Sequence, residues 1–292
     1  MITTYKAVKK YHNGKIRGIA RSIALDSLFV KDVIVNNDYL LDIPRIQFLY
    51  IHHVFKDEVD NFDLLLKYLS KKHTFISHSE AVERLLTGNV DKPYISWSSD
   101  DGIHNNILAA EVLNRYGASC CFFLNPYSIG LKEEVKLKAF CNKKLKLPEV
   151  SFLDWNDVSQ LQKQGHEIGA HTYSHDRVSD LTLEEFEDDF RKTDEELYAK
   201  CGRIKHFAYT YGKFNDFNKK AYDVVFSNGY ESCSSATRGC HISKGDVLNK
   251  NELLIRRDQI IAGWPLHQIK YFIKASAKKL TLDTNYLPNS YK

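Results

Sequence analysis

After about residue 45, the sequence alternates short apolar runs with longer stretches in which apolar residues recur every three or four positions. The short runs are rich in β-branched and aromatic residues, which is typical of strands covered on both faces. They lie at residues 48–52, 74–76, 94–98, 119–124, 167–171, 207–209, 230–233 and 253–256. The amphipathic stretches predict helices at 61–70, 79–86, 105–116, 154–164, 182–200, 215–226 and 265–278. This alternation predicts repeated β–α units around a parallel sheet or barrel.

Local signals support these boundaries. Thr182 precedes Leu183, Glu184 and Glu185 in a Thr-x-x-Glu capping box, and glycines stand where four of the helices should end. These are Gly117, Gly165, Gly202 and Gly229. Eight strands over about 230 residues favour an α/β fold of the barrel kind or a distorted relative of one. A doubly wound open sheet is the alternative, but no G-x-G-x-x-G follows a strand to support a dinucleotide site.

Composition narrows the class of protein. Hydrophobic residues make up 43% and charged residues 27% of the 292 positions, so disorder, collagen and coiled coil are excluded. The net charge of +4 is spread along the chain and gives no reason to expect a nucleic-acid partner. The six cysteines contain no C-x-x-C and are expected to be reduced thiols.

The first residues of the chain indicate where in the cell the protein is expected to lie. No apolar run follows its basic residues, and no stretch approaches the ~20 apolar residues of a spanning helix, so we expect a cytoplasmic protein without a spanning segment. Residues 1–31 hold seven Lys or Arg and a single acid, Asp26. A solvated basic face is the favoured interpretation, and weak peripheral contact of the N-terminus with anionic lipid is the alternative.

Two motifs carry candidate chemistry. His171 and His175 follow the strand pattern at 167–171, and the adjacent carboxylates Asp100 and Asp101 follow the strand at 94–98. Loop histidines and an Asx turn or helix cap would explain each motif structurally. Because both motifs lie at carboxyl ends of strands, two histidines and one carboxylate can instead hold Zn²⁺ or another divalent ion with one position open for water. The neighbouring carboxylate could then take a proton from that water.

Three further segments lie near this predicted mouth. The strand at 206–212 ends in Tyr211 and Gly212, a turn that can aim backbone N–H groups at a developing oxyanion, although its Phe-Ala-Tyr is also an ordinary core strand. His52 or His53 would face the mouth from the end of the first strand. The polar segment 125–150 is long for a β–α connection, and we expect it to border the site.

The motifs resemble those of the polysaccharide deacetylase family, the NodB-type carbohydrate esterases. Residues 98–102, Ser-Ser-Asp-Asp-Gly, are similar to its Thr-Phe-Asp-Asp-Gly motif, and residues 165–175 are similar to its second motif. Residues 207–212 are similar to the Phe-Ala-Tyr-Pro-Tyr-Gly variant of its third, and His52 matches the histidine of a Tyr-His strand that often opens these domains. The resemblance runs from about residue 47 to 275.

This resemblance implies a distorted (β/α)7-type barrel over residues 47–279, with an N-terminal extension at 1–46 and a C-terminal tail at 280–292. It also implies metal-dependent hydrolysis of an acetamido or formamido group on a sugar. By position, it assigns one divalent ion, most simply Zn²⁺, to Asp101, His171 and His175. It assigns the general base to Asp100 and part of the oxyanion site to the backbone N–H of Tyr211.

The sequence departs from the family pattern in several places. Residues 98–99 are Ser-Ser in place of Thr-Phe, and Thr210 stands where the family usually has proline. Many members carry an arginine that orients the base at the position of Ala208, and we expect Arg256 or Arg257 to replace it.

The general acid is the least determined residue. Many members supply it from a C-terminal Leu-x-His motif, for which Leu266-His267 is a faint match. Because residues 266–273 read as the core stripe of a helix, we favour His52 over His267. His104, His206 and His241 are further, unranked candidates.

The predicted reaction is N-deacetylation, or deformylation, of an N-acylated sugar, sugar nucleotide or oligosaccharide that serves as an intracellular precursor of a surface polysaccharide. One alternative is a carbohydrate-binding barrel that has lost catalysis. The other is a metal hydrolase that acts on a different amide or ester bond.

Overall fold

The computed structural model describes residues 1–11, 15–35, 37–280 and 286–291. Its strands are β1 (Arg45–Ile51), β2 (Thr74–Phe75), β3 (Pro93–Asp100), β4 (Cys120–Leu124), β5 (Glu167–Ala170), β6 (His206–Ala208), β7 (Ser232–Ser234), β8 (Leu254–Ile255) and β9 (Arg257–Gln259). Its helices are α1 (Tyr5–Tyr11), α2 (Lys15–Val35), α3 (Val59–Leu69), α4 (His78–Leu86), α5 (Asn106–Arg115), α6 (Glu134–Ala139), α7 (Trp155–Lys163), α8 (Leu183–Cys201), α9 (Lys219–Ser227) and α10 (Leu266–Leu280).

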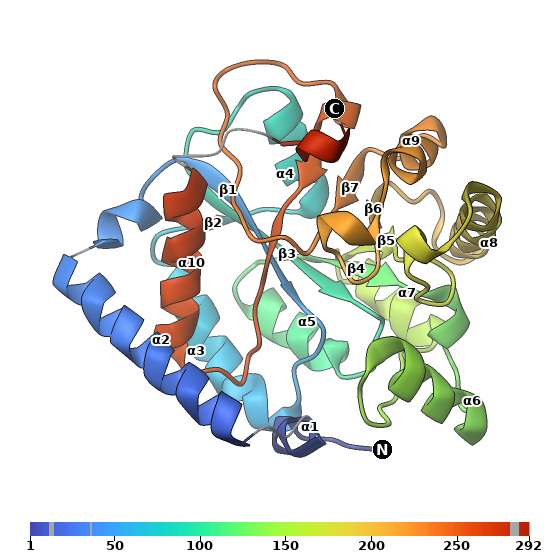
Figure 1. Ribbon diagram of the computed structural model, residues 1–292, viewed down its shortest axis with the longest axis horizontal. Coiled ribbons are helices and arrows are strands. Elements are labelled where there is room, and N and C mark those ends of the chain that lie inside the picture. The colour runs from blue at the N-terminus through green and yellow to red at the C-terminus, as the bar shows by residue number, and fades with distance from the viewer. Residues whose placement is uncertain (12–14, 36, 281–285, 292) are drawn as a thin grey trace.

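The strands form a nearly closed parallel barrel with helices around it (Figure 1). Neighbours follow the order β8-β7-β6-β5-β4-β3-β1-β9, and the short β2 pairs with the start of β3. β8 pairs with β7 and β9 pairs with β1, so the single segment 254–259 joins both edges of the sheet. This confirms the predicted barrel and excludes the doubly wound alternative, whose strand order would reverse at a switch point.

β4 shows how the sequence builds two faces. Cys120, Phe122 and Leu124 belong to the large core between sheet and helices, whereas Cys121 and Phe123 pack with Ala208 in a separate cluster. Successive strand residues point to opposite faces, so an apolar run such as Cys-Cys-Phe-Phe-Leu fills both layers. Fully burying a side chain of this size contributes about 1.5–3 kcal/mol.

Helix ends agree with the sequence signals. Thr182 accepts a hydrogen bond from the backbone N–H of Glu185, and the Glu185 side chain accepts one from Thr182, which completes the predicted capping box. The four predicted stop glycines all have positive φ, from 65° to 87°. The six cysteines are unpaired.

Several elements lie outside the predicted pattern, including the short strand β9 after the predicted strand at 253–256. α1 and α2 precede the barrel, and α2 packs along α10 (Figure 1). The segment 125–150, predicted as a connection, contains α6 and a π-helical turn at Phe140–Leu145. None of the described helices is both long enough and apolar enough to cross a bilayer. The division at residues 46 and 279 stays a prediction.

Candidate active site

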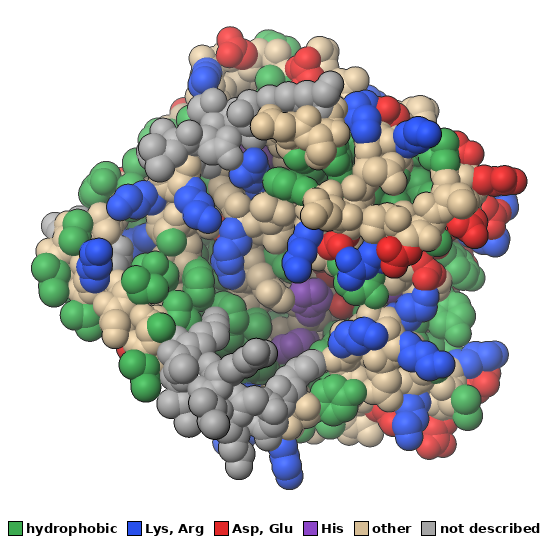
Figure 2. All heavy atoms as spheres, viewed as in Figure 1, with side chains coloured by type: hydrophobic (Ala, Val, Ile, Leu, Met, Phe, Trp, Pro, Cys, Tyr) green, Lys and Arg blue, Asp and Glu red, His purple; other side chains and the backbone are tan. Residues whose placement is uncertain are grey.

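Two strand ends bring the predicted metal ligands together. Asp101 directly follows β3, and His171 directly follows β5, which lies two strands away in the sheet. Both residues therefore lie at the carboxyl end of the barrel. Nε2 of His171 lies 3.5 Å, and Nε2 of His175 3.3 Å, from Oδ1 of Asp101. All three side chains are buried, and histidine side chains are visible in the hollow at the centre of the face in Figure 2.

The orientation of His171 is set by the neighbouring strand. Its Nδ1–H donates to the carbonyl oxygen of Ala208 at 2.6 Å, which leaves the lone pair of Nε2 facing Asp101. A histidine ligand usually donates its other N–H in this way. The sequence could not name this partner, because Ala208 belongs to β6 and its carbonyl direction depends on the barrel.

The donor set fits a divalent ion. Two ligands each about 2.0–2.1 Å from a tetrahedral Zn²⁺ lie about 3.3–3.4 Å apart, close to the observed 3.3 and 3.5 Å. Oδ1 of Asp101 and Nδ1 of His175 are buried and have no hydrogen-bond partner among the described residues. A buried polar atom without a partner costs about 1–3 kcal/mol, and a cation would satisfy the carboxylate.

The electrostatics keep Asp101 charged. Burial opposes ionisation and raises its pKa, but the close approach of the His171 and His175 rings outweighs burial and holds the pKa well below its usual range. Asp101 is therefore a carboxylate at neutral pH, the form that binds metal.

Backbone strain concentrates in these loops. Five non-glycine residues of the described chain have positive φ, and four of them lie in the three motif loops: Asp101 (73°), Thr172 (56°), His175 (57°) and Tyr211 (62°). Such conformations cost about 1–3 kcal/mol each and persist only where the surroundings impose them. Asn125, at the end of β4, provides part of that support by donating to the carbonyl of Thr172 at 3.0 Å.

Arg257 forms a bidentate hydrogen-bonded ion pair with Asp100. Nη1 and Nη2 of the guanidinium donate to its two carboxylate oxygens at 2.7 and 2.9 Å, and Nε donates to the carbonyl of Ser235 at 2.8 Å. The guanidinium also lies over the ring of Tyr50, 4.6 Å from its centre. Of the two candidates left open by the sequence, Arg256 stacks on Phe214 instead.

This pair controls the ionisation of Asp100. Burial raises its pKa, but the charge of Arg257 outweighs burial and lowers it below the usual value. The arginine expected at Ala208 is thus replaced by one from β9, on the other side of the barrel.

His52 faces the ligand cluster. Its Nε2 lies 4.0 Å from Oδ2 of Asp101, and its Nδ1 lies 3.3 Å from the side-chain amide of Gln259. Burial lowers the pKa of His52, and the Asp101 and Asp100 carboxylates partly oppose this shift. His267, the competing general acid, lies elsewhere: its Nε2 is 2.7 Å from Oδ1 of Asp26 in the interface between α10 and α2.

Tyr211 lies beside the cluster. Its ring centre is 5.1 Å from that of His175, and its backbone N–H makes no hydrogen bond within the described part of the chain. Its hydroxyl donates to the carbonyl of Lys144 at 3.3 Å, so the segment 125–150 borders the site as expected. Gly212 is required here, because a Cβ would lie 2.2 Å from Cβ of Ala236.

Two supporting residues escaped the sequence analysis, Asn125 and Gln259. Asn125 opens an Asn-Pro pair directly after the apolar strand β4, and Gln259 ends the polar run Arg257-Asp258-Gln259, which forms β9. Arg257 and Asp258 are both 0% exposed, and charged residues are rarely buried in this way. This polar run was the sequence feature that could have indicated a functional role for Gln259.

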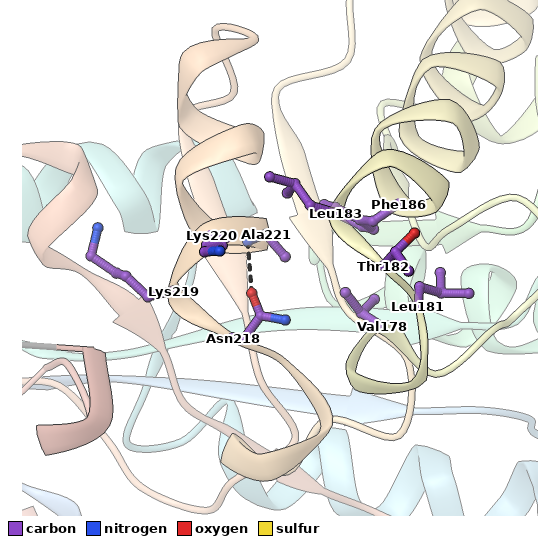
Figure 3. Close-up of a pocket in the computed structure, with 9 residues that line it drawn as sticks. All are labelled: Val178, Leu181, Thr182, Leu183, Phe186, Asn218, Lys219, Lys220 and Ala221. Carbon is purple, nitrogen blue, oxygen red and sulfur yellow. Dashed lines mark hydrogen bonds between the residues drawn. The ribbon is translucent and has the colours of Figure 1, made fainter.

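A separate groove lies between the first turns of α8 and α9 (Figure 3). Its polar groups are engaged in capping, as Asn218 accepts from the backbone N–H of Ala221 at 3.0 Å. Val178, Leu181 and Phe186 form much of the rest of the lining, so the groove offers neither a metal ligand set nor an acid–base pair.

Comparisons with solved structures show the same fold. IcaB from Ammonifex degensii superposes with a TM-score of 0.63 at 18% identity, over 81% of this chain and 98% of that one. The Streptococcus pyogenes deacetylase PplD, solved in complex with acetate, gives 0.60 at 15% identity over 78% and 96%. A de-N-acetylase from Aggregatibacter actinomycetemcomitans gives 0.57 at 15% identity over 78% and 99%.

The sequence comparisons identify the family. No curated protein matches the chain. The family model described as polysaccharide deacetylase matches residues 87–232, a range that begins before β3 and ends at the start of β7. This range is half of the chain and includes Asp100, Asp101, His171, His175 and Tyr211. The chain therefore belongs to the polysaccharide deacetylase family.

Proposed function

We propose that the protein removes an N-acetyl or N-formyl group from an acylamino sugar, with one divalent ion, most simply Zn²⁺, held by Asp101, His171 and His175. Membership of the family supports carbohydrate deacetylation. The observation that carries metal dependence is the meeting of three buried donor side chains at 3.3 and 3.5 Å around an otherwise unsatisfied carboxylate oxygen.

A bound divalent ion would supply an activated water and polarise the acyl carbonyl. Asp100 accepts the proton of the attacking water on a carboxylate oxygen, and it is ionised for this task because Arg257 lowers its pKa. The two hydrogen bonds from Arg257 also fix the plane of the carboxylate. Lacking an acceptor within the described chain, the backbone N–H of Tyr211 is free to donate to the developing oxyanion.

His52 completes the proton transfers. Expulsion of an amine requires protonation of its nitrogen, and Nε2 of His52 faces the cluster while the amide of Gln259 lies against Nδ1. Because burial lowers its pKa, the protonated ring is a stronger acid than an exposed imidazolium. The pairing of His267 with Asp26, in the interface between α10 and α2, argues against this role for His267.

The binding-only alternative loses its main support. It rested on the missing arginine at Ala208 and on the uncertain acid. The contacts of Arg257 with Asp100 and the position of His52 beside Asp101 support the catalytic proposal instead. The substrate is proposed to be a sugar nucleotide or an oligosaccharide precursor, and the cytoplasmic location stays a prediction.

The test is product release by the zinc-loaded protein. We expect free acetate or formate from at least one member of a panel of N-acylated sugars, sugar nucleotides and oligosaccharides. Asp100→Asn should keep the fold and the metal content while lowering kcat by about 10²–10⁴-fold. Asp223→Asn, at an exposed carboxylate on α9 paired with Lys219, is the matched control and should keep full activity. Normal turnover by Asp100→Asn would reject the assigned base, and a product other than a free amine would reassign the reaction.

A further inference from the structure

Helix α2 uses one face to pack on the barrel. Leu25 is 7% exposed, and Asp26 pairs with His267 and accepts from the side-chain amide of Gln268 at 2.9 Å. The ring of Phe29 lies 5.1 Å from that of His267. These contacts fix which side of α2 faces α10.

The side of α2 that faces away from α10 carries three exposed aliphatic side chains. Ile23, Val30 and Ile34 are 62%, 55% and 77% exposed. At 100° per residue, Val30 and Ile34 each lie within about 20° of Ile23 around the helix, on opposite sides of it, so the three side chains form one stripe about 40° wide. We call this set the α2 stripe. Three aliphatic side chains aligned along one helix and exposed to water differ from singly scattered surface residues.

Helix α1 places positive charge at the mouth of the barrel. The backbone N–H groups of Tyr5 and Lys6 donate to Asp57 at 2.7 and 3.2 Å, in the loop that follows β1 and His52. Lys6, Lys9 and Lys10 are exposed. Residues 1–35 contain seven Lys or Arg against two Asp.

Helix α2 lies at an edge of the face that contains the mouth (Figure 1). Hydrophobic side chains lie along the edge that α2 occupies in Figure 1, on the same face whose central hollow shows histidines in Figure 2. A flat surface that covered the stripe would therefore also meet the entrance to the candidate active site.

We propose that α1 and α2 dock the barrel mouth onto an anionic membrane surface. In this arrangement α2 lies in the plane of the interface with the α2 stripe in the acyl boundary, and the lysines of α1 contact anionic headgroups. A second copy of the chain fits less well, because it would bring two segments with the same excess of positive charge together. Anionic lipid removes that repulsion. This docking does not depend on the proposed reaction.

The experiment is co-sedimentation of the full chain with vesicles of phosphatidylcholine alone or of equal parts phosphatidylcholine and phosphatidylglycerol. We expect binding to the anionic vesicles that weakens as salt is raised. The triple variant Ile23→Ser, Val30→Ser, Ile34→Ser should lower the partition coefficient by at least about tenfold. A control with Tyr198→Ser and Val247→Ser, at sites 63% and 80% exposed elsewhere, should bind as the wild type does.

The charge requirement is tested separately. Reversing Lys6, Lys9 and Lys10 to Glu should lower binding to anionic vesicles by at least about 100-fold, since each basic residue near such a surface contributes about 1 kcal/mol and the new carboxylates are repelled. Reversal of the exposed Lys163 and Lys220 should have a smaller effect.

The single variant Ile23→Trp supplies a readout that does not depend on folding of the triple variant: its added fluorescence should shift to shorter wavelength with anionic vesicles. Equal binding to both vesicle types, or unchanged binding of both triple variants, would overturn the proposal. So would a dimer in solution that the serine variant dissociates, because the α2 stripe would then belong to a second copy.

Discussion

Replacing Arg257 is the sharpest test of how the proposed base is controlled. Arg257→Gln removes a guanidinium that donates to both oxygens of Asp100, at 2.7 and 2.9 Å. Arg257 is 0% and Asp100 3% exposed, so the variant leaves a buried carboxylate without its countercharge. Removing one partner of a buried pair costs about 3–5 kcal/mol, and we expect the free energy of unfolding to fall by that order.

The same change acts on catalysis through the ionisation of Asp100. Burial raises its pKa and Arg257 lowers it, so without Arg257 the pKa rises and a smaller fraction of the base is ionised at a given pH. The acid limb of kcat/KM should therefore move to higher pH. Each hydrogen bond to a charged group contributes about 1.5–3 kcal/mol, and loss of about 3 kcal/mol of orientation corresponds to roughly 10²-fold in kcat. Arg257→Lys keeps the charge but not the two-pronged geometry, so we expect a smaller pH shift and about tenfold loss.

The assay is acetate release from an acetylated amino-sugar oligomer over a series of pH values, with thermal unfolding measured in parallel. Arg256→Gln is the control, since that side chain stacks on Phe214 and should leave the pH profile unchanged. If folded Arg257→Gln kept kcat within about threefold and its acid limb in place, Arg257 would be only a structural residue.

Three further results are expected. Asp101→Asn should lower Zn²⁺ affinity by about 100-fold or more in a calorimetric titration, and retained affinity would reject the ligand set. His52→Gln should lower kcat by about 10²–10⁴-fold with metal content unchanged, whereas His267→Gln should keep kcat, and the reverse pattern would exchange their roles. Burial lowers the pKa of His166 to about 4 in the folded protein, whereas it is about 6.5 in the unfolded chain. Between these values the unfolded chain binds more protons than the folded protein. The free energy of unfolding should therefore fall by about 2 kcal/mol through this residue as the pH is lowered from 7 to 5. His166→Asn, which can still accept from the N–H of Cys120, should flatten urea-unfolding stability over that window by this amount, and an unchanged slope would contradict it.

The metal-ligand part of the site could be predicted because its motifs directly follow strands of a parallel barrel. The runs before Asp100 and His171 read as buried strands, and parallel strands all end at the same edge of a barrel. A short motif after such a strand is therefore placed in three dimensions without knowledge of the loops. This explains why Asp101, His171 and His175 could be brought together from the sequence.

The site residues that the sequence left undetermined depend on contacts between distant segments of the chain. Arg257 reaches Asp100 only because the segment 254–259 closes the barrel, pairing with β7 first and β1 second. Nothing in the local pattern distinguishes Arg257 from Arg256. His267 was similarly ambiguous, because its partner Asp26 is 241 residues away on a helix that had no expected place in the fold.

Strain and unsatisfied polarity coincide at the barrel mouth. Asp101 and His175 have left-handed backbones, and each also carries a buried atom with no hydrogen-bond partner among the described residues. Both features oppose folding, and a sequence selected for stability alone would place glycine or a paired side chain at such positions. Residues that violate local rules in this way mark positions where function outweighs stability. Because a divalent ion would bind the carboxylate oxygen that no donor satisfies, the features that make the mouth costly to fold are the ones that support a metal site.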